Sequence, residues 1–575
     1  MPLLPGKKIM QIKSLLSQLE AAKQWRDPGP DAKVEKLLAS AKGLRFRDAD
    51  ALIRFHDLLL FLRAFPQNDK VLRAADQLLA GIRKQVNQLL ESGADMDDFD
   101  PESVSGIAGT TLTDTFTYEV ADWLAQRYPQ HLTADWDIDE QSRSLGLALP
   151  RFIPLLDDDA MVEADTPYLT WLRDAAGKKT DVVWLLERFR ELPLSPADKT
   201  ELYDAMRLSL KWNLTESPAS RTLARRKVAK FFFHKEPLIQ RKQVSLAQEF
   251  QSPPLPVRKL ETHEAGEILD LCREAVTVRY RELYGTTRGD PAQIHEASPG
   301  RGIQMFLWGL PADRRLPLRA YHAGFTLKNG VPINYIEGIS LFEWMEVGFN
   351  TFYTYRDGET AWIYSKALHF LHQLTGVKCI SVYPYQLGHE NDEAIQSGAF
   401  WFYRKLGFRP GRQQSQAIVQ KEEKKLAANP RYRTSAATLR KLAADHAFYE
   451  IPGQAPGRWD HFSVRNLGFA VQRYMAKHHD GKASLMRAAS RGTLIRILDV
   501  NPNAWNPVER AAFENFSLLA ALIPDLSSWT AEEKQALVEI IRAKASENEA
   551  DYLRRLQQHT RLRHEILRLG SAEEK

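Results

Sequence analysis

Cysteine is nearly absent from this sequence, which has two, Cys272 and Cys379, among 575 residues. Two cysteines so far apart can build neither a disulfide framework nor a Cys-rich metal site. No metal site is predicted elsewhere, and no metal is expected as a cofactor. We expect a reducing, cytoplasmic environment for the protein.

Long apolar runs are also missing. No window of about 18 apolar residues occurs, so no membrane-spanning helix is predicted. The opening residues, MPLLPGKKIMQIKS, carry no continuous apolar stretch behind the lysines, and we expect no signal peptide. With 44% apolar and 26% charged residues, the composition is that of a soluble globular protein.

Excess charge is small overall and concentrated in one place. The chain has 78 Lys and Arg against 73 Asp and Glu, while the segment Arg221–Lys242 alone holds eight against one. Outside that segment the balance is 78 − 8 = 70 positive against 73 − 1 = 72 negative. Basic side chains interleaved with Phe231, Phe232 and Phe233 fit nucleic-acid, nucleotide or coenzyme phosphates or anionic lipid. A helix that buries its phenylalanines and turns its charges to solvent or an acidic neighbour is the favoured interpretation.

The spacing of apolar residues divides the chain into three parts. Residues 1–250 have mostly helical spacing and predict a helical domain. The run QSPPLPV at 251–257 has three prolines and predicts a linker. Residues 258–412 alternate strands and helices, with a hairpin turn at Asn329-Gly330, and residues 426–575 return to helical spacing. The predicted fold is α+β, a central mixed sheet flanked by all-helical N- and C-terminal regions.

The central part has a distinctive order: helix, hairpin, long strand, helix, strand, then a short helix ending in AFWFYRKLGF at 399–408. This order and motif resemble the GNAT superfamily of N-acyltransferases, over the central domain only. The resemblance implies an enzyme that moves an acyl group from acyl-coenzyme A, most often acetyl-coenzyme A, to an amine. The acceptor, a small molecule or a protein, cannot be named from the residues.

Two backbone features of such a layout suit coenzyme A. Where two parallel strands splay apart, unpaired backbone groups can bond an extended pantetheine arm, and the next helix N-terminus offers N–H groups to a pyrophosphate. The predicted cofactor contacts are Val347, Phe349, Tyr355, Arg356, Gly358, Thr360, Ala361 and Gln396. The phosphate loop departs from the family pattern, because Gly358 is its single glycine and Glu359 adds a negative charge.

Acyl transfer to an amine also needs a base and an acid. Tyr403 occupies the family's usual tyrosine position and is the predicted acid. Glu337, Glu343 and Glu346 lie in or beside the strands of the predicted cleft, and one of them is the predicted base, acting directly or through water.

Two other functions remain open from the residues. An aminoacyl-tRNA-dependent transferase also occurs on GNAT-like folds and would use the basic segment at 221–242. The other function is that of a non-catalytic interaction scaffold whose central domain has lost its activity.

Overall fold

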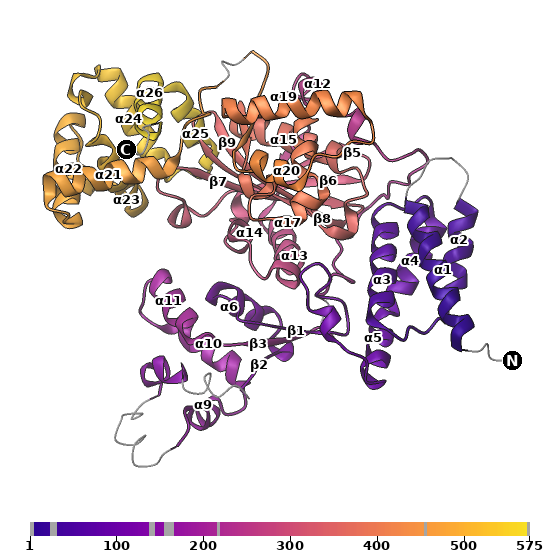
Figure 1. The fold of residues 1–575 in the computed structure, drawn as a ribbon. Coiled ribbons are helices and arrows are strands. Elements are labelled where there is room, and N and C mark those ends of the chain that lie inside the picture. Colours follow the sequence, from indigo (N-terminus) through magenta and orange to yellow (C-terminus); the bar gives the residue numbers. More distant parts are fainter. Residues whose placement is uncertain are drawn as a thin grey trace.

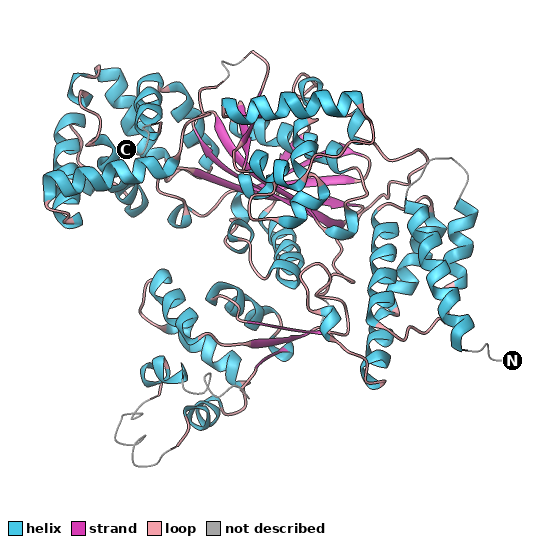
Figure 2. Ribbon diagram, in the orientation of Figure 1, coloured by secondary structure: helices cyan, strands magenta, loops and turns pink. Residues whose placement is uncertain are grey.

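A nine-stranded mixed sheet runs through the middle of the protein, with helices packed around it (Figure 1). The computed structural model describes residues 5–23, 31–136, 144–153, 166–215, 219–453 and 457–571. In this part of the chain most ordered residues are helical, and the strands gather in one large sheet and one small one (Figure 2). The α+β class predicted from the sequence is confirmed.

The strands of the large sheet follow the order β11-β12-β10-β9-β8-β7-β6-β5-β4. They are β4 Val257–Lys259, β5 His295–Gly300, β6 Ile303–Trp308, β7 Ala320–Lys328, β8 Val331–Leu341, β9 Trp344–Thr351, β10 Cys379–Val382, β11 Arg409–Pro410 and β12 Ala447–Glu450. Among the described pairings of this sheet, that of β9 with β10 is parallel and the others are antiparallel. The hairpin between β7 and β8 is confirmed at Asn329 and Gly330, whose φ values of 50° and 81° suit a tight turn.

Two long helices cover opposite faces of the sheet. The Phe349 ring contacts Tyr364 of α15, Thr360–Thr375, at 4.8 Å between centroids. The next residue along β9, Asn350, points to the other face, which is covered by α13, Thr262–Tyr280. There the Asn350 Nδ2 donates to the Tyr280 hydroxyl at 3.0 Å. This alternation is what a strand requires. The shorter helices around the sheet are α12 Leu246–Glu249, α14 Tyr284–Thr287, α16 Pro384–Leu387, α17 Asp392–Ser397, α18 Ala399–Arg404, α19 Gln413–Ala428 and α20 Ala436–Ala443.

Helices form the first part of the chain, as predicted. They are α1 Pro5–Lys23, α2 Asp31–Ser40, α3 Ala49–Ala64, α4 Asp69–Ala80 and α5 Ile82–Glu91. Asp48 caps α3 by accepting a hydrogen bond from the Ala51 backbone N–H at 2.8 Å. The buried side of α3 continues into the core of the large sheet, so this layer is fixed to the central domain.

A second lobe follows and corrects the expectation of an all-helical N-terminal region. It contains β1 Thr111–Asp114, α6 Tyr118–Arg127, β2 Leu132–Ala134, α9 Tyr168–Ala176, α10 Asp181–Glu191, α11 Pro196–Met206 and β3 Leu210–Asn213. Its three strands form an antiparallel sheet in the order β1-β3-β2 over a core that includes Trp212 and Phe189. Strands of three or four residues are too short to show a period of two in the sequence.

The C-terminal region folds as a helical bundle with its own core. Its helices are α21 Val464–His479, α22 Ala483–Leu498, α23 Pro507–Ala520, α24 Ala531–Ala543, α25 Glu549–Gln558 and α26 Thr560–Gly570. The expectation that residues 426–575 are all helical is corrected by β12, which pairs with β10 in the large sheet. The central domain therefore continues past residue 412 to about β12, because a partner strand for β10 is supplied from further along the chain.

Residues 221–242, the strap, form no α-helix, and only Arg241 and Lys242 at their end belong to a 3-10 helix, Arg241–Gln243. Their backbone bonds to distant segments: Arg221 N–H to the Gly106 carbonyl, Arg226 N–H to that of Gly330, and His234 N–H to that of Pro66, at 2.8–2.9 Å. These bonds replace the i to i−4 bonds of a helix. The strap thus ties the N-terminal helices to the β7–β8 hairpin.

The proline-rich segment at 251–257 is fastened rather than free. Both backbone groups of Leu255 bond to the side chain of Gln373 in α15, each at 2.9 Å.

Among the helices in the described residues, none is long and apolar enough to cross a membrane.

Candidate active site

The strands β9 and β10 separate at one point of the large sheet. Their parallel pairing runs from Trp344 with Cys379 to Val347 with Val382. β10 ends there, whereas β9 continues to Thr351. Beyond Val347 the backbone N–H of Phe349 meets the side-chain oxygen Oε1 of Gln386 at 3.4 Å instead of a strand partner. The sequence analysis expects unpaired backbone groups where two parallel strands separate, and here the Gln386 side chain bonds to one of them.

Tyr403 reaches the same point from the other side. Its hydroxyl donates to Oε1 of Gln386 at 3.1 Å, and its ring packs edge-on against Tyr364 and Phe408. Burial raises the pKa of the Tyr403 phenol well above its usual value, so it keeps its proton at neutral pH. One side-chain oxygen therefore joins the predicted acid to the unpaired end of β9.

Glu346 lies on β9, and its side chain points to the opposite face of the sheet from that of Phe349. Its carboxylate is 3.0 Å from Nε2 of His446, which precedes β12, and the two side chains are 20% and 33% exposed. Gly348 follows Glu346 by two residues on the same face of β9, about 7 Å away at the usual rise of a strand. Gly348 lies against the Gln386 side-chain amide. Glu346 and His446 are thus a solvent-reachable acid–base pair on the Gln386 side of the sheet.

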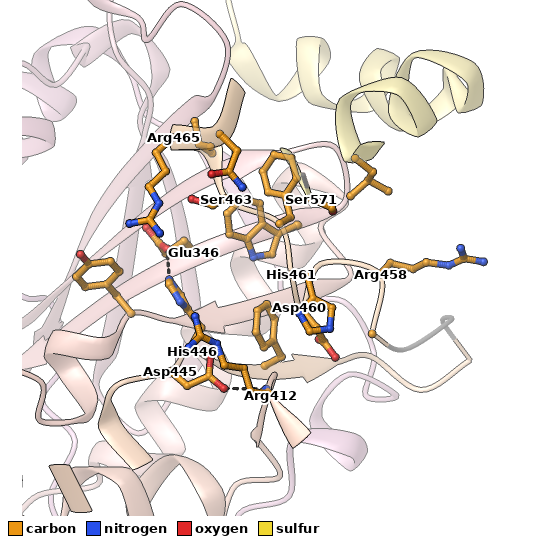
Figure 3. A pocket seen from close by; sticks show the side chains of 18 of the residues that line it. Glu346, Arg412, Asp445, His446, Arg458, Asp460, His461, Ser463, Arg465 and Ser571 are labelled. Carbon is orange, nitrogen blue, oxygen red and sulfur yellow. Dashed lines mark hydrogen bonds and ion pairs between the residues drawn. The ribbon is translucent and has the colours of Figure 1, made fainter. Parts of the chain in front are cut away.

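This pair opens into a cleft of about 1420 Å³ between the sheet and the C-terminal bundle (Figure 3). Its charged lining consists of Arg319, Arg412, Arg458, Arg465, Arg568, His389, His446, His461, His564, Glu346, Asp445 and Asp460. Arg412 bonds through its backbone to Asp445, whereas Arg458 points outward at the rim (Figure 3). Among the described residues, Arg319 and Arg465 have no ion-pair partner, so the cleft suits an anionic ligand.

The other two glutamates have structural partners. Glu337 accepts a hydrogen bond from the Tyr321 hydroxyl at 2.6 Å, and burial raises its pKa. Burial alone would raise the pKa of Glu343 too, but hydrogen bonds from Arg563 and Trp459 hold it below its usual range. Neither lines the cleft. Of the three predicted bases, Glu346 is the one placed to meet a substrate.

The predicted phosphate loop is covered by the N-terminal helices. Tyr355 is buried, and a Cβ on Gly358 would lie 2.6 Å from the Phe65 ring of the α3 end. Glu359, at the start of α15, is fully buried, with its carboxylate 3.5 Å from Lys328 Nζ and hydrogen-bonded to Arg301. The Phe65 ring therefore covers the start of α15, and a buried carboxylate lies next to it.

The remaining predicted contacts are scattered. Val347, Phe349 and Ala361 are buried between β9 and α15. Arg356 pairs with Glu393, Thr360 donates to the Arg356 carbonyl at 3.3 Å, and Gln396 is exposed on α17. The structure does not bring these residues together with the cleft.

Sequence reasoning missed Gln386, His446 and two arginines of the cleft, Arg319 and Arg465. Gln386 follows the strand end at Val382 by four residues, where ligand-binding side chains often occur in such sheets, and this is a signal that could have found it. His446 lies in a region with helical spacing, and nothing local marks it. In the described ranges no three His, Cys, Asp or Glu side chains converge to hold a metal ion.

Comparison of the chain with family models, with curated proteins and with solved structures found no match. The functional conclusions below therefore depend on the geometry and on the chemistry of the residues described above.

Proposed function

We propose that the protein transfers an acyl group to an amine at the end of β9. The observation that carries the proposal is the meeting of the unpaired Phe349 N–H and the Tyr403 hydroxyl on Gln386 Oε1. In the proposed complex an acyl donor replaces the Gln386 side chain, with its carbonyl oxygen at the Phe349 N–H and its leaving atom at the Tyr403 hydroxyl. Beside it, Glu346 and His446 face a cleft large enough for a small-molecule substrate.

Each residue has a defined role in the proposed reaction. Glu346 accepts the hydrogen bond of His446, and His446 removes the proton from the attacking amine. As the nitrogen–carbon bond forms, the Phe349 N–H donates to the carbonyl oxygen, which becomes negative. As the bond to the leaving atom breaks, Tyr403 gives that atom its proton. Gln386 must turn aside to admit the donor.

Acyl-coenzyme A fits this site in part. An extended thioester arm can lie along β9, where backbone groups beyond Val347 have no strand partner. The pyrophosphate does not fit at the start of α15, because Phe65 and Glu359 occupy that position. No step above requires a phosphate contact there.

The same misfit favours a second candidate, a transferase that takes its acyl group from aminoacyl-tRNA. Such a donor needs no pyrophosphate loop, and the arginines of the cleft suit its phosphates. In the strap, the basic segment predicted to serve it, Arg221, Arg225 and Arg226 are used for packing instead. This candidate therefore places its phosphate contacts on the cleft side of the molecule.

The test compares two glutamates and one tyrosine. Product formation is followed by mass spectrometry with acetyl-coenzyme A, or with aminoacyl-tRNA, and a mixture of amines. Loss of an acid or base costs about 10²–10⁴ in rate, so we expect that loss for Tyr403→Phe. Glu346→Gln should also lower the rate, because His446, the base, then lacks the carboxylate that accepts its hydrogen bond. Glu337→Gln, which changes the same group outside the cleft, retains activity.

Thermal stability provides an independent measurement, because a ligand that binds the folded protein raises its melting temperature. Equal activity of Glu346→Gln, Tyr403→Phe and the parent protein contradicts the proposed roles. Absence of both turnover and a melting shift with either donor contradicts acyl transfer and leaves the scaffold.

A further inference from the structure

A second cation-rich segment lies in the C-terminal bundle. Residues 464–498, the basic helix pair, comprise α21, α22 and the turn between them. Their charged residues are Arg465, Arg473, Lys477, Lys482, Arg487, Arg491, Arg496 and Asp480, a net charge of 7 − 1 = +6. Throughout the described residues, none of these seven cations forms an ion pair. The cations therefore retain their charge for a partner.

The helix pair packs through one side and exposes the other. Leu467, Met486 and Leu494 are buried in the bundle core, at 1–3% exposure. The exposed side has two large apolar residues, Phe469 at 42% and Leu485 at 49%. A helix that lies in a membrane surface needs a broad exposed apolar face, and here that face is already buried in protein.

The helix pair begins at the cleft. Arg465, in the first turn of α21, lines the cleft together with Arg319, and Figure 3 shows Arg465 directed toward Glu346. From there α21 runs outward along the bundle (Figure 1). A row of free cations thus leads from the exposed helices to the cleft, which suits a linear polyanion better than a flat surface.

An exposed aromatic ring adds to this pattern. Phe469 lies one turn along α21 from Arg465, and Arg473 follows one turn later. Cations that track a phosphate backbone, with an aromatic ring on which a base can stack, are what single-stranded nucleic-acid sites combine.

We propose that the basic helix pair binds the phosphate backbone of a single-stranded nucleic acid whose end enters the cleft. Arg473, Lys477 and Arg487 contact phosphates, Phe469 stacks a base, and Arg465 with Arg319 holds the end of the strand. Binding does not depend on the proposed acyl transfer and is measured without it.

Fluorescence anisotropy of a labelled oligo(U) with the full-length protein tests this proposal. We expect binding that weakens steeply as salt rises from about 50 to about 200 mM. The variant Arg473→Ala/Lys477→Ala/Arg487→Ala should lose at least tenfold in affinity, and its salt slope should fall by about 2, since each single-strand phosphate contact contributes about 0.7. Phe469→Ala should lose affinity with an unchanged salt slope.

The matched control removes the same charge elsewhere. Lys227→Ala/Lys230→Ala/Lys235→Ala takes three exposed cations from the strap and should leave oligo(U) binding unchanged. All seven positions changed to Ala here are at least partly exposed, and an unchanged melting temperature confirms that each variant is folded.

Three results overturn the proposal: no oligo(U) binding at about 50 mM salt, an equal loss in the two triple variants, or binding only to phosphatidylserine vesicles. Stronger binding of a blunt duplex than of oligo(U) overturns the single-stranded assignment as well, because a duplex has no free end to enter the cleft.

Discussion

The strap and the basic helix pair carry nearly equal net charge, +7 and +6, and use it in opposite ways. In the strap, Arg221 is 2% exposed and donates to the carbonyls of Ser103 and Glu102. Arg225 pairs with Asp76 at 2.9 Å, and Arg226 pairs with Glu264. In the helix pair no cation is paired among the described residues. Arg221, Arg225 and Arg226 of the strap belong to the internal structure, while the lysines of the strap are exposed like most cations of the helix pair.

The comparison shows that the density of charge in a sequence does not indicate whether the charged side chains are paired in the structure. The partners of the strap come from residues that are distant in sequence, such as Asp76 at 149 positions from Arg225. The helix pair spreads its cations over two helices and a turn, so it looks like an ordinary solvated surface. The four predictions that follow test this division, beginning with the largest effect.

Arg221→Met should lower the free energy of unfolding by about 3–5 kcal/mol, because it leaves buried carbonyls without their donor. Burial already lowers the pKa of Arg221 to about 9, which shows how completely the group is enclosed. Arg473→Met in the helix pair should cost less than about 0.5 kcal/mol. Urea unfolding measures both. Similar losses in the two variants would erase the distinction between the segments.

Gly330→Ala should show that the strap is held in place. A Cβ at Gly330 would lie 2.2 Å from the Arg226 carbonyl oxygen, in a backbone with φ of 81°. Gly481, between α21 and α22, has a similar φ of 70° but nothing within 4 Å. We expect Gly330→Ala to destabilise the protein by about 2 kcal/mol more than Gly481→Ala, the difference being the steric term. Equal melting temperatures of the two variants would mean that the strap moves to make room for the new Cβ and is not held in place.

The strap should make the free energy of unfolding depend on pH through a buried histidine. His234 is 3% exposed, and burial, with Lys328 and Arg301, lowers its pKa to about 2. Below about pH 6.5 the unfolded chain binds a proton there that the folded protein does not. The free energy of unfolding should therefore fall by about 1.4 kcal/mol per pH unit as the pH falls below about 6.5, and this term is absent above it.

The check is urea unfolding at about pH 7 and about pH 5.5. His234→Phe keeps the ring packing against Phe232 and Phe65 and removes the titration, so it should lose about 1.4 kcal/mol less than the parent protein over that interval. An equal loss in both proteins would place the acid sensitivity elsewhere.

The smallest effect is expected in the helix pair itself. Arg473 and Lys477 are four residues apart on α21, and like charges at that spacing repel by about 0.2–0.5 kcal/mol. Lys477→Ala should raise the free energy of unfolding by about that amount at low salt, and the gain should vanish at high salt. A loss of stability would indicate a hidden partner for Lys477.

Local features of the fold could be predicted from the sequence, and distant contacts could not. The Asn329-Gly330 turn and the helix from Thr360 are local, because residue type fixes φ and spacing fixes the helix. The strap was beyond reach because its conformation depends on hydrogen bonds to residues such as Gly106 and Gly330.

The same division applies to the candidate site. A strand through Phe349 with unpaired backbone groups and a tyrosine at 403 could be named from the sequence, and Gln386 joins them in the structure. His446 is 100 positions from Glu346 and joins it through the pairing of β12 with β10. Phe65 reaches Gly358 from another layer of the protein. Neither contact has a signal in the local residue pattern.

Asn329 joins three parts of the chain. Its side chain donates to the carbonyls of Ala64 and Phe232, at 2.9 and 3.0 Å, and accepts the Phe232 N–H at 2.8 Å. A ribosome makes Ala64 and Phe232 long before Asn329, and N-terminal segments fold first. The N-terminal helices must therefore wait, with their docking surface open, until the hairpin turn has been synthesised. Until then the apolar side of α3 lacks part of the surface against which it packs in the folded protein.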